Sequence, residues 1–187
     1  MQTTPVPLTS RIFCVGINYL DHAEEANRVS GCDLPKVPRS SAAGSELDDF
    51  DRMHRTNVRG TFIVDQQAAR RVRAGGAIIN FSSPVVKIAL PSYTAYAATK
   101  GAVDAMTLIL AKEMRGHDIT VNAVAPGPTA TPLFLDDKPQ QVIDTMKNMT
   151  PLQRLGEPAD IAEAVAFLAG PARWINGQIL YANGGVI

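Results

Sequence analysis

The chain has 187 residues, of which 45% are hydrophobic and 19% are charged, as in an ordinary globular protein with one core. Eighteen basic residues balance eighteen acidic ones, so no net charge favours nucleic acid or an anionic membrane as a partner. No apolar run is long enough to predict a membrane span, and the first residues lack the pattern of a secretory signal. We therefore expect a cytoplasmic protein in which Cys14 and Cys32 are reduced thiols that bind no metal.

The first 44 residues differ in composition from the rest of the chain. The apolar run "RIFCVGINYL" (residues 11–20) predicts a short strand, and "DHAEEANR" (residues 21–28) predicts a short helix. Glycine, proline and serine then cluster between residues 28 and 45, which is typical of a connector. We therefore divide the chain into an atypical N-terminal segment with its connector, residues 1–44, and one α/β domain, residues 45–187.

Residues 45–72 predict a helix, with Ser45 as its cap and acidic residues in its first turns. Its apolar stripe is interrupted between Thr56 and Gly60. Three later runs predict buried strands, namely "GGAIINFSS", "DITVNAVAP" and "GQILYANGG", and two predict helices, namely "PSYTAYAATKGAVDAMTLILAKEMRG" and "PADIAEAVAFLAG". Strands that alternate with helices predict a parallel sheet with helices on both faces, in the manner of a truncated Rossmann-like fold.

A serine, a tyrosine and a lysine form a candidate catalytic set. Ser83 ends a predicted strand, at the edge where open α/β sheets bind ligands, and Tyr96 follows thirteen positions later. Lys100 lies four residues after Tyr96, so both side chains share one helix face. A free phenol, with a pKa near 10, is a poor base at neutral pH, and a nearby cation lowers that pKa. A serine hydroxyl could hydrogen-bond a substrate oxygen as charge develops on it. This set suits carbonyl reduction or alcohol oxidation.

Each of these residues also has an ordinary structural interpretation. Tyr96 and Lys100 could be an aromatic and a solvated amine on one helix face. Ser83 could cap the turn that follows its strand, and Asn57 could satisfy the backbone where the apolar stripe is interrupted. The residues alone leave these alternatives open.

Several segments in a fixed order carry a family resemblance. They are "NVRGTF", "GGAIINFSS", "YAATKGAV", "ITVNAVAPGPTATPL", "RLGEPADIAEAVAFLA" and "GQILYANGG". In these segments, residues 45–187 resemble the C-terminal two-thirds of a short-chain dehydrogenase/reductase. The resemblance implies an NAD(P)-dependent oxidoreductase that transfers a hydride between the nicotinamide and a carbonyl or secondary alcohol.

The resemblance also implies a role for each site residue. Tyr96 would be the general acid/base, and Ser83 would donate a hydrogen bond to the substrate oxygen. Lys100 would lower the pKa of Tyr96 and hold the nicotinamide ribose, while Asn57 would position a water that extends the proton relay. The implied cofactor-binding residues are Tyr96, Lys100, Pro126, Gly127 and Thr129, with NAD or NADP as the cofactor.

The family pattern further implies a variable substrate lid at residues 130–150. Leu133, Phe134 and Leu135 in this lid indicate either a hydrophobic substrate or simple packing of the lid. A homodimer or homotetramer is implied through helices at residues 57–75 and 93–115.

One family feature does not occur in this sequence. Complete members begin with a strand, a glycine-rich turn and a helix that together bind the cofactor pyrophosphate. Here "CVGINYLDH" has the single Gly16, with Tyr19 and Leu20 where small residues would be needed, and "SSAAG" (residues 40–44) matches a later family element only weakly. We therefore expect impaired cofactor binding, and the residues that would choose NAD over NADP have no counterpart.

The N-terminal segment carries a second resemblance. The run "RIFCVGINYLDHAEEANR" resembles the start of the catalytic region in the fumarylacetoacetate hydrolase family, whose DHxxE element would make His22 and Glu25 a proton-transfer dyad. Three hypotheses follow. The chain is an oxidoreductase, a non-catalytic remnant that acts through an oligomer surface, or a hydrolase that uses His22 and Glu25.

Overall fold

The computed structural model describes residues 12–15, 44, 46–135 and 139–187, and these form a small parallel sheet covered by helices. Its strands are β1 (Ile12–Val15), β2 (Ala77–Phe81), β3 (Thr120–Pro126) and β4 (Ile179–Ala182). They lie in the spatial order β1-β2-β3-β4, and each neighbouring pair is parallel. The α/β fold with a parallel sheet is therefore confirmed, and each of the four predicted strand segments contains one of these strands.

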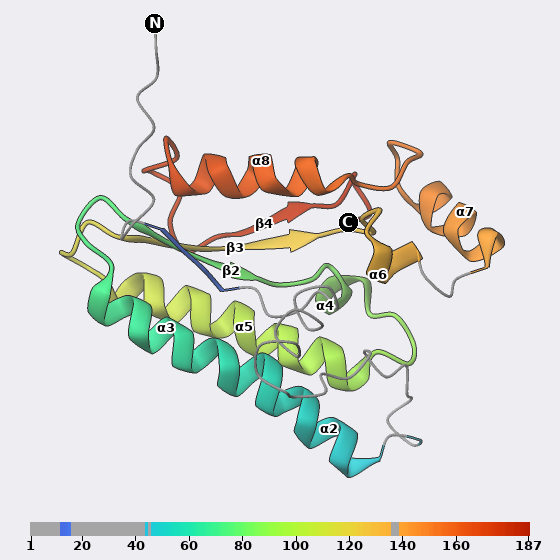
Figure 1. The fold of residues 1–187 in the computed structure, drawn as a ribbon, viewed down its shortest axis with the longest axis horizontal. Coiled ribbons are helices and arrows are strands. Elements are labelled where there is room, and N and C mark those ends of the chain that lie inside the picture. The colour runs from blue at the N-terminus through green and yellow to red at the C-terminus, as the bar shows by residue number, and fades with distance from the viewer. Residues whose placement is uncertain (1–11, 16–43, 45, 136–138) are drawn as a thin grey trace, which may run out of the picture.

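The helices lie on both faces of this sheet, as the sequence predicts. They are α2 (Leu47–His54), η1 (Arg55–Arg59), α3 (Gly60–Arg71), α4 (Val85–Ile88), α5 (Thr94–Glu113), α6 (Pro132–Leu135), α7 (Gln140–Met149) and α8 (Pro158–Ala169). Helices α3 and α5 cover one face, and α8 covers the other (Figure 1). Within the described part of the chain, no helix combines the length and apolar character needed to cross a membrane.

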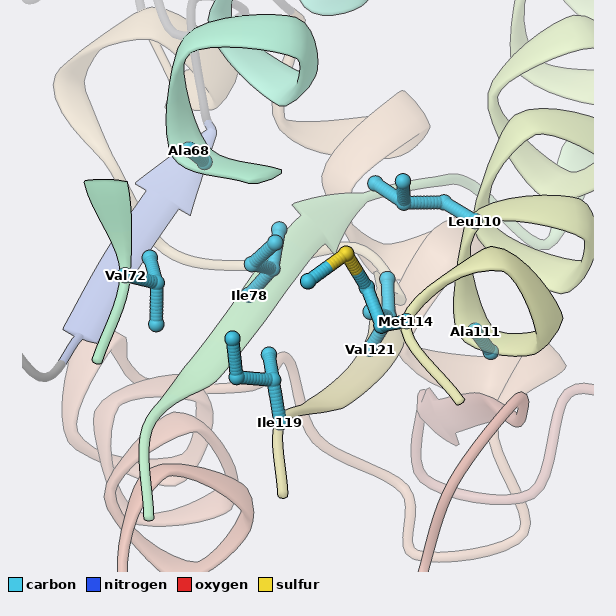
Figure 2. Packing of buried hydrophobic residues seen from close by; sticks show 8 residues of the cluster. All are labelled: Ala68, Val72, Ile78, Leu110, Ala111, Met114, Ile119 and Val121. Carbon is cyan, nitrogen blue, oxygen red and sulfur yellow. The ribbon is translucent and has the colours of Figure 1, made fainter. Parts of the chain in front are cut away.

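The core consists of two layers, one on each side of the sheet. Successive strand residues point to opposite faces, so Ile78 packs towards α3 and α5 while Ala77 and Ile79 pack towards α8. Around Ile78, Figure 2 shows Met114 and Leu110 of the α5 region close to Val121 of β3. The central strands are buried on both faces, which explains why their sequences are almost continuously apolar.

The interruption predicted between Thr56 and Gly60 is a change of helix type. Residues Arg55–Arg59 form a π-helical turn that joins α2 directly to α3, so the rod continues through the interruption. The N-terminus of α2 departs from the prediction, because Glu46 and not Ser45 occupies the N-cap position. The predicted helix at residues 21–28 and most of the connector lie outside the described residues.

A buried cluster of polar side chains joins β2 to the two helices that cover it, α3 and α5. The Nδ2 group of Asn80, on β2, donates to Oδ2 of Asp65 at 3.1 Å and to Oγ1 of Thr107 at 2.9 Å. Asp65 is 4% exposed, and its Oδ1 has no hydrogen-bond partner among the described residues. Burial raises the pKa of Asp65 to about 6, although the hydrogen bond from Asn80 opposes the rise.

This raised pKa gives the stability of the protein a pH dependence. Between about pH 4 and pH 6 the folded state binds the Asp65 proton more tightly than the unfolded state, so the free energy of unfolding falls as pH rises. Asp65→Asn removes this contribution, so we expect the variant to gain stability relative to the wild type from pH 4 to pH 7. Urea denaturation at four pH values measures the difference. Asp144→Asn, at an exposed position, is the control. If the free energy of unfolding plotted against pH runs parallel for Asp65→Asn and the wild type, Asp65 is not the source of the pH dependence.

Candidate active site

A cavity of about 300 Å³ is lined by residues at the carboxyl ends of β2 and β3 and by residues of α4 and α6. Figure 1 shows where these elements lie. The residues that line the cavity are Phe81, Ser82, Ser83, Pro84, Val85, Ile88, Leu90, Tyr93, Tyr96, Lys100, Pro126, Gly127, Pro128, Thr129, Thr131, Phe134, Met146, Met149 and Val186. This is the edge of the sheet at which open α/β folds bind their ligands. The cavity brings together segments that are up to about a hundred residues apart in the sequence.

Six of the seven residues to which the short-chain dehydrogenase/reductase resemblance gave a catalytic or cofactor-binding role line this cavity. They are Ser83, Tyr96, Lys100, Pro126, Gly127 and Thr129. The seventh, Asn57, is buried behind it at 5% exposure. The residues of the second resemblance, His22 and Glu25, lie outside the described residues, as does Gly16.

Lys100 is the most deeply buried charged residue at the cavity, with 1% of its surface exposed. Its Nζ donates to the carbonyl oxygen of Phe81 at 2.8 Å, and lies 5.7 Å from the centroid of the Tyr96 ring. Burial lowers the pKa of Lys100 to about 7, while the Asp104 carboxylate acts in the opposite direction. The helix spacing therefore does place an ammonium beside the phenol, as the sequence predicts.

Asp104 is a second charged group beneath the cavity. It follows Lys100 by one turn of α5, so the two side chains share a helix face. Burial raises the pKa of Asp104, and the Ser82 hydroxyl and the ammonium groups of Lys100 and Lys87 oppose the rise. Ser82 Oγ approaches the carboxylate, but the geometry falls outside that of a normal hydrogen bond. Lys87 also holds its Nζ 4.4 Å from the centroid of the Tyr181 ring.

Asn57 reaches the site through a chain of hydrogen bonds. Its Nδ2 donates to Oγ1 of Thr99 at 3.0 Å, and Oγ1 of Thr99 donates to the backbone carbonyl of Tyr96 at 2.8 Å. The π-helical turn directs Asn57 towards α5, and such turns occur often at functional sites. Asn57 therefore supports the first turn of α5, where Tyr96 lies.

Ser83 makes the capping contact that the sequence allowed and also lines the cavity. Its Oγ accepts a hydrogen bond from the backbone N–H of Val85 at 3.3 Å, which stabilises the turn into α4. The same residue lines the cavity together with Tyr96. Because a hydroxyl can accept one hydrogen bond and donate another, the capping role leaves its proton available to a ligand.

The opposite wall of the cavity depends on a close contact between β3 and β4. A Cβ atom on Gly127 would lie 2.6 Å from the Cα of Asn183, so only glycine fits at that position. Thr129 Oγ1 donates to the carbonyl of Gly127 at 2.9 Å, which stiffens the segment that follows β3. Within the described residues, no group of three or more His, Cys, Asp and Glu side chains could hold a metal ion.

Comparison with known proteins gives the family of the chain. Residues 35–187 match the family model described as enoyl-(acyl carrier protein) reductase. A short-chain type dehydrogenase/reductase of Picea abies is 43% identical over 143 residues, which are 75% of this chain and 53% of that protein. The chain belongs to the short-chain dehydrogenase/reductase family.

Other members of this family support the same assignment. An NADPH-dependent aldehyde reductase-like protein, chloroplastic, of Arabidopsis thaliana is 41% identical over 156 residues, covering 82% of this chain and 57% of that protein. The chain thus spans about half the length of these curated relatives. The crystal structure of angucycline C-6 ketoreductase LanV with bound NADP is 31% identical with a TM-score of 0.76, over 87% of this chain and 66% of that one. A short-chain dehydrogenase from Burkholderia cenocepacia in complex with NADP is 34% identical with a TM-score of 0.74, over 80% and 61%.

Sequence reasoning missed two residues of the site. Asp104 stands four positions after Lys100, and this helical spacing was the available signal. Thr99, which is fully buried, links Asn57 to Tyr96, and no feature of the sequence indicates that link. The predicted lid at residues 130–150 contains the short helix α6 and the longer helix α7, with residues 136–138 outside the described part.

Replacing Asp104 tests the electrostatics beneath the cavity. Asp104→Asn removes the carboxylate that favours the charged form of Lys100, so we expect the pKa of Lys100 to fall by about one unit below its wild-type value of about 7. The pKa of Lys100 can be measured by NMR titration of protein labelled at lysine. The Lys100 signal is assigned from its loss in Lys100→Met. Asp65→Asn, a buried change on α3, should leave the titration midpoint unchanged. An unchanged midpoint in Asp104→Asn would show that the carboxylate does not act on Lys100.

Proposed function

We propose that the chain is an NAD(P)-dependent oxidoreductase of the short-chain dehydrogenase/reductase type, acting on a carbonyl compound or a secondary alcohol. The observation that carries the proposal is the convergence of Ser83, Tyr96 and Lys100 on one cavity at the carboxyl edge of the sheet. Residues 45–187 are the proposed catalytic portion. A cytoplasmic location remains a prediction of the sequence, and one relative is named as chloroplastic.

In the proposed reduction, a nicotinamide held by Lys100, Tyr96 and the segment from Pro126 to Thr129 would supply the hydride that the carbonyl carbon accepts. Tyr96 donates its phenolic proton to the carbonyl oxygen, and the proton moves in the opposite direction during alcohol oxidation. Ser83 donates a hydrogen bond to the same oxygen as negative charge develops on it. The Lys100 ammonium stabilises the phenolate that Tyr96 becomes. Asn57 extends the relay that returns a proton to Tyr96, through a water that it positions.

The residues present fit the nicotinamide end of the cofactor. Lys100 and Tyr96 offer donors for the ribose hydroxyls, and the segment from Pro126 to Thr129 forms the wall against which the ring would lie. Gly127 supports this fit, because its close packing on Asn183 fixes the position of the wall that Pro126, Pro128 and Thr129 line. Solved relatives that carry NADP make a nicotinamide cofactor the natural choice. The choice between NAD and NADP remains open.

The pyrophosphate end of the cofactor has weaker support in this chain. The sequence after β1 contains only Gly16 where a glycine-rich turn is needed for backbone N–H groups to approach a phosphate. We therefore propose that this chain binds the cofactor through its nicotinamide half and with reduced affinity. Binding isotherms with NADPH and with nicotinamide mononucleotide compare the two parts directly.

We also propose that the protein forms a homodimer or homotetramer through α3 and α5, within residues 57–75 and 93–115. Phe62 and Ile109 are 55% and 57% exposed, and they line a groove of about 390 Å³ between the two helices. Exposed apolar side chains that gather on neighbouring helices are typical of a protein interface. A self-complementary face of this kind suits a two-fold axis.

Replacing Tyr96 tests the mechanism. Tyr96→Phe removes the proton that the mechanism transfers, so we expect kcat/KM for ketone reduction to fall at least a hundredfold. Tyr93→Phe is the matched control, because Tyr93 lines the same cavity and its ring lies 6.4 Å from that of Tyr96. The control should lose less than tenfold. Equal activity of Tyr96→Phe and the wild type, measured from NADPH oxidation, would exclude the proposed role.

Replacing Ile109 tests the oligomer. Ile109→Asp places a charge in the apolar groove, so we expect the assembly to dissociate to monomers at micromolar concentration. Analytical ultracentrifugation gives the mass of each species. Leu152→Asp is the control, since Leu152 is 64% exposed and lies outside α3 and α5. The interface is wrong if Ile109→Asp keeps the mass of the wild-type assembly.

A further inference from the structure

The active-site cavity has an apolar half whose composition restricts the substrate. Away from Ser83, Tyr96 and Lys100, its walls are formed by Ile88, Leu90, Tyr93, Phe134, Met146, Met149 and Val186. These come from α4, the α4–α5 connection, α6, α7 and the C-terminal residues, so apolar groups surround the space on several sides. Lys100 is the single charged residue among the described residues that line it.

Among the described residues, three lysines near this half have partners elsewhere. Lys87 lies over the Tyr181 ring, with its Nζ 4.4 Å from the ring centroid. Lys147, on α7, lies 3.8 Å from Asp144 on the same helix and is not among the residues that line the cavity. Lys100 is itself engaged with the carbonyl of Phe81. A carboxylate or phosphate in the apolar half would therefore lose much of its hydration and find no described cation beside it, which is costly.

The walls also indicate the shape of the ligand. Tyr93 and Phe134 offer aromatic rings, and Met146 and Met149 offer flexible thioethers that pack well against rings. A volume of about 300 Å³ is at the lower end of the range for small-molecule pockets, and the nicotinamide must share it. The space left suits a body that packs against these rings and thioethers.

We propose that the substrate of this site is an uncharged ketone or aldehyde with an apolar body that contains a ring, and that the site discriminates against carbonyl compounds with an anionic group on that body. This inference rests on the proposed function and adds the substrate class to it. Met149, on α7, is 39% exposed at the edge of the cavity, so it is the position at which a new charge can be introduced with least effect on the core.

A pair of ketones that differ in charge tests the inference. The probes are 4-methylacetophenone and 4-acetylbenzoate, which share the reacting carbonyl and the ring. We expect kcat/KM with NADPH to be at least tenfold higher for the uncharged ketone, because the carboxylate must be desolvated. Equal values, or a preference for 4-acetylbenzoate, would overturn the proposal.

Variants at Met149 locate the discrimination in the cavity. Met149→Lys supplies the missing cation, so we expect kcat/KM for 4-acetylbenzoate to rise about tenfold while that for 4-methylacetophenone falls. Met149→Gln, similar in length but uncharged, should not raise kcat/KM for the carboxylate. Leu152→Lys adds the same charge three residues later, outside this cavity. It should keep the wild-type ratio of kcat/KM for 4-methylacetophenone to kcat/KM for 4-acetylbenzoate. A change of ratio in Leu152→Lys as large as that in Met149→Lys would mean that net charge alone explains the preference.

A binding measurement separates this inference from the proposed function. Saturation-transfer NMR with the wild-type protein and each ketone requires no turnover. If neither ketone is reduced but 4-methylacetophenone binds at least tenfold more tightly than 4-acetylbenzoate, the proposed function fails and the assigned ligand class stands. If both bind equally or neither binds, the ligand class is wrong, whatever the turnover.

Discussion

The hydrogen bond from Lys100 Nζ to the carbonyl of Phe81 is the contact on which the candidate site depends. It ties the first turns of α5 to the carboxyl end of β2, so that Tyr96 and Ser83 line the same cavity. An ammonium that is 1% exposed is unfavourable unless a hydrogen bond and an opposite charge compensate for its lost hydration. The Phe81 carbonyl of β2 supplies the first, and Asp104, also on α5, supplies the second.

The other wall of the site is held by shape and not by charge. Gly127 packs directly on Asn183, so the segment after β3 lies close to the carboxyl end of β4. The site thus has one side with a buried charged pair and one rigid side that Pro126, Pro128 and Thr129 line. In the proposed function, the nicotinamide ring would lie against the rigid side and its ribose would meet the hydrogen-bond donors of the other.

Much of this arrangement could be predicted from the sequence, for physical reasons that differ between elements. Strand β2 is an apolar run bounded by glycines, and α5 has an apolar stripe over five turns, so both signals are local and strong. The contacts of Asp65 with Asn80 and of Asn57 with Thr99 join residues far apart in the chain, and nothing local reveals them. The prediction of Ser45 as the N-cap was wrong. Serine is a residue type that suits an N-cap, but the N-cap position is one residue later, at Glu46.

The π-helical turn at Arg55–Arg59 has a consequence for how this chain tolerates insertions and deletions. A π turn holds about one residue more than an α turn, and one residue rotates a helix face by about 100°. The turn therefore lets α2 present one face towards α5 while α3 presents a differently phased face to β1 and β2. Loss of a single residue from this turn would restore an ordinary helix, yet it would turn Asn57 or the apolar side of α3 away from its partner. Elsewhere on a helix surface a substitution changes one side chain, but here the length of the segment is itself under constraint.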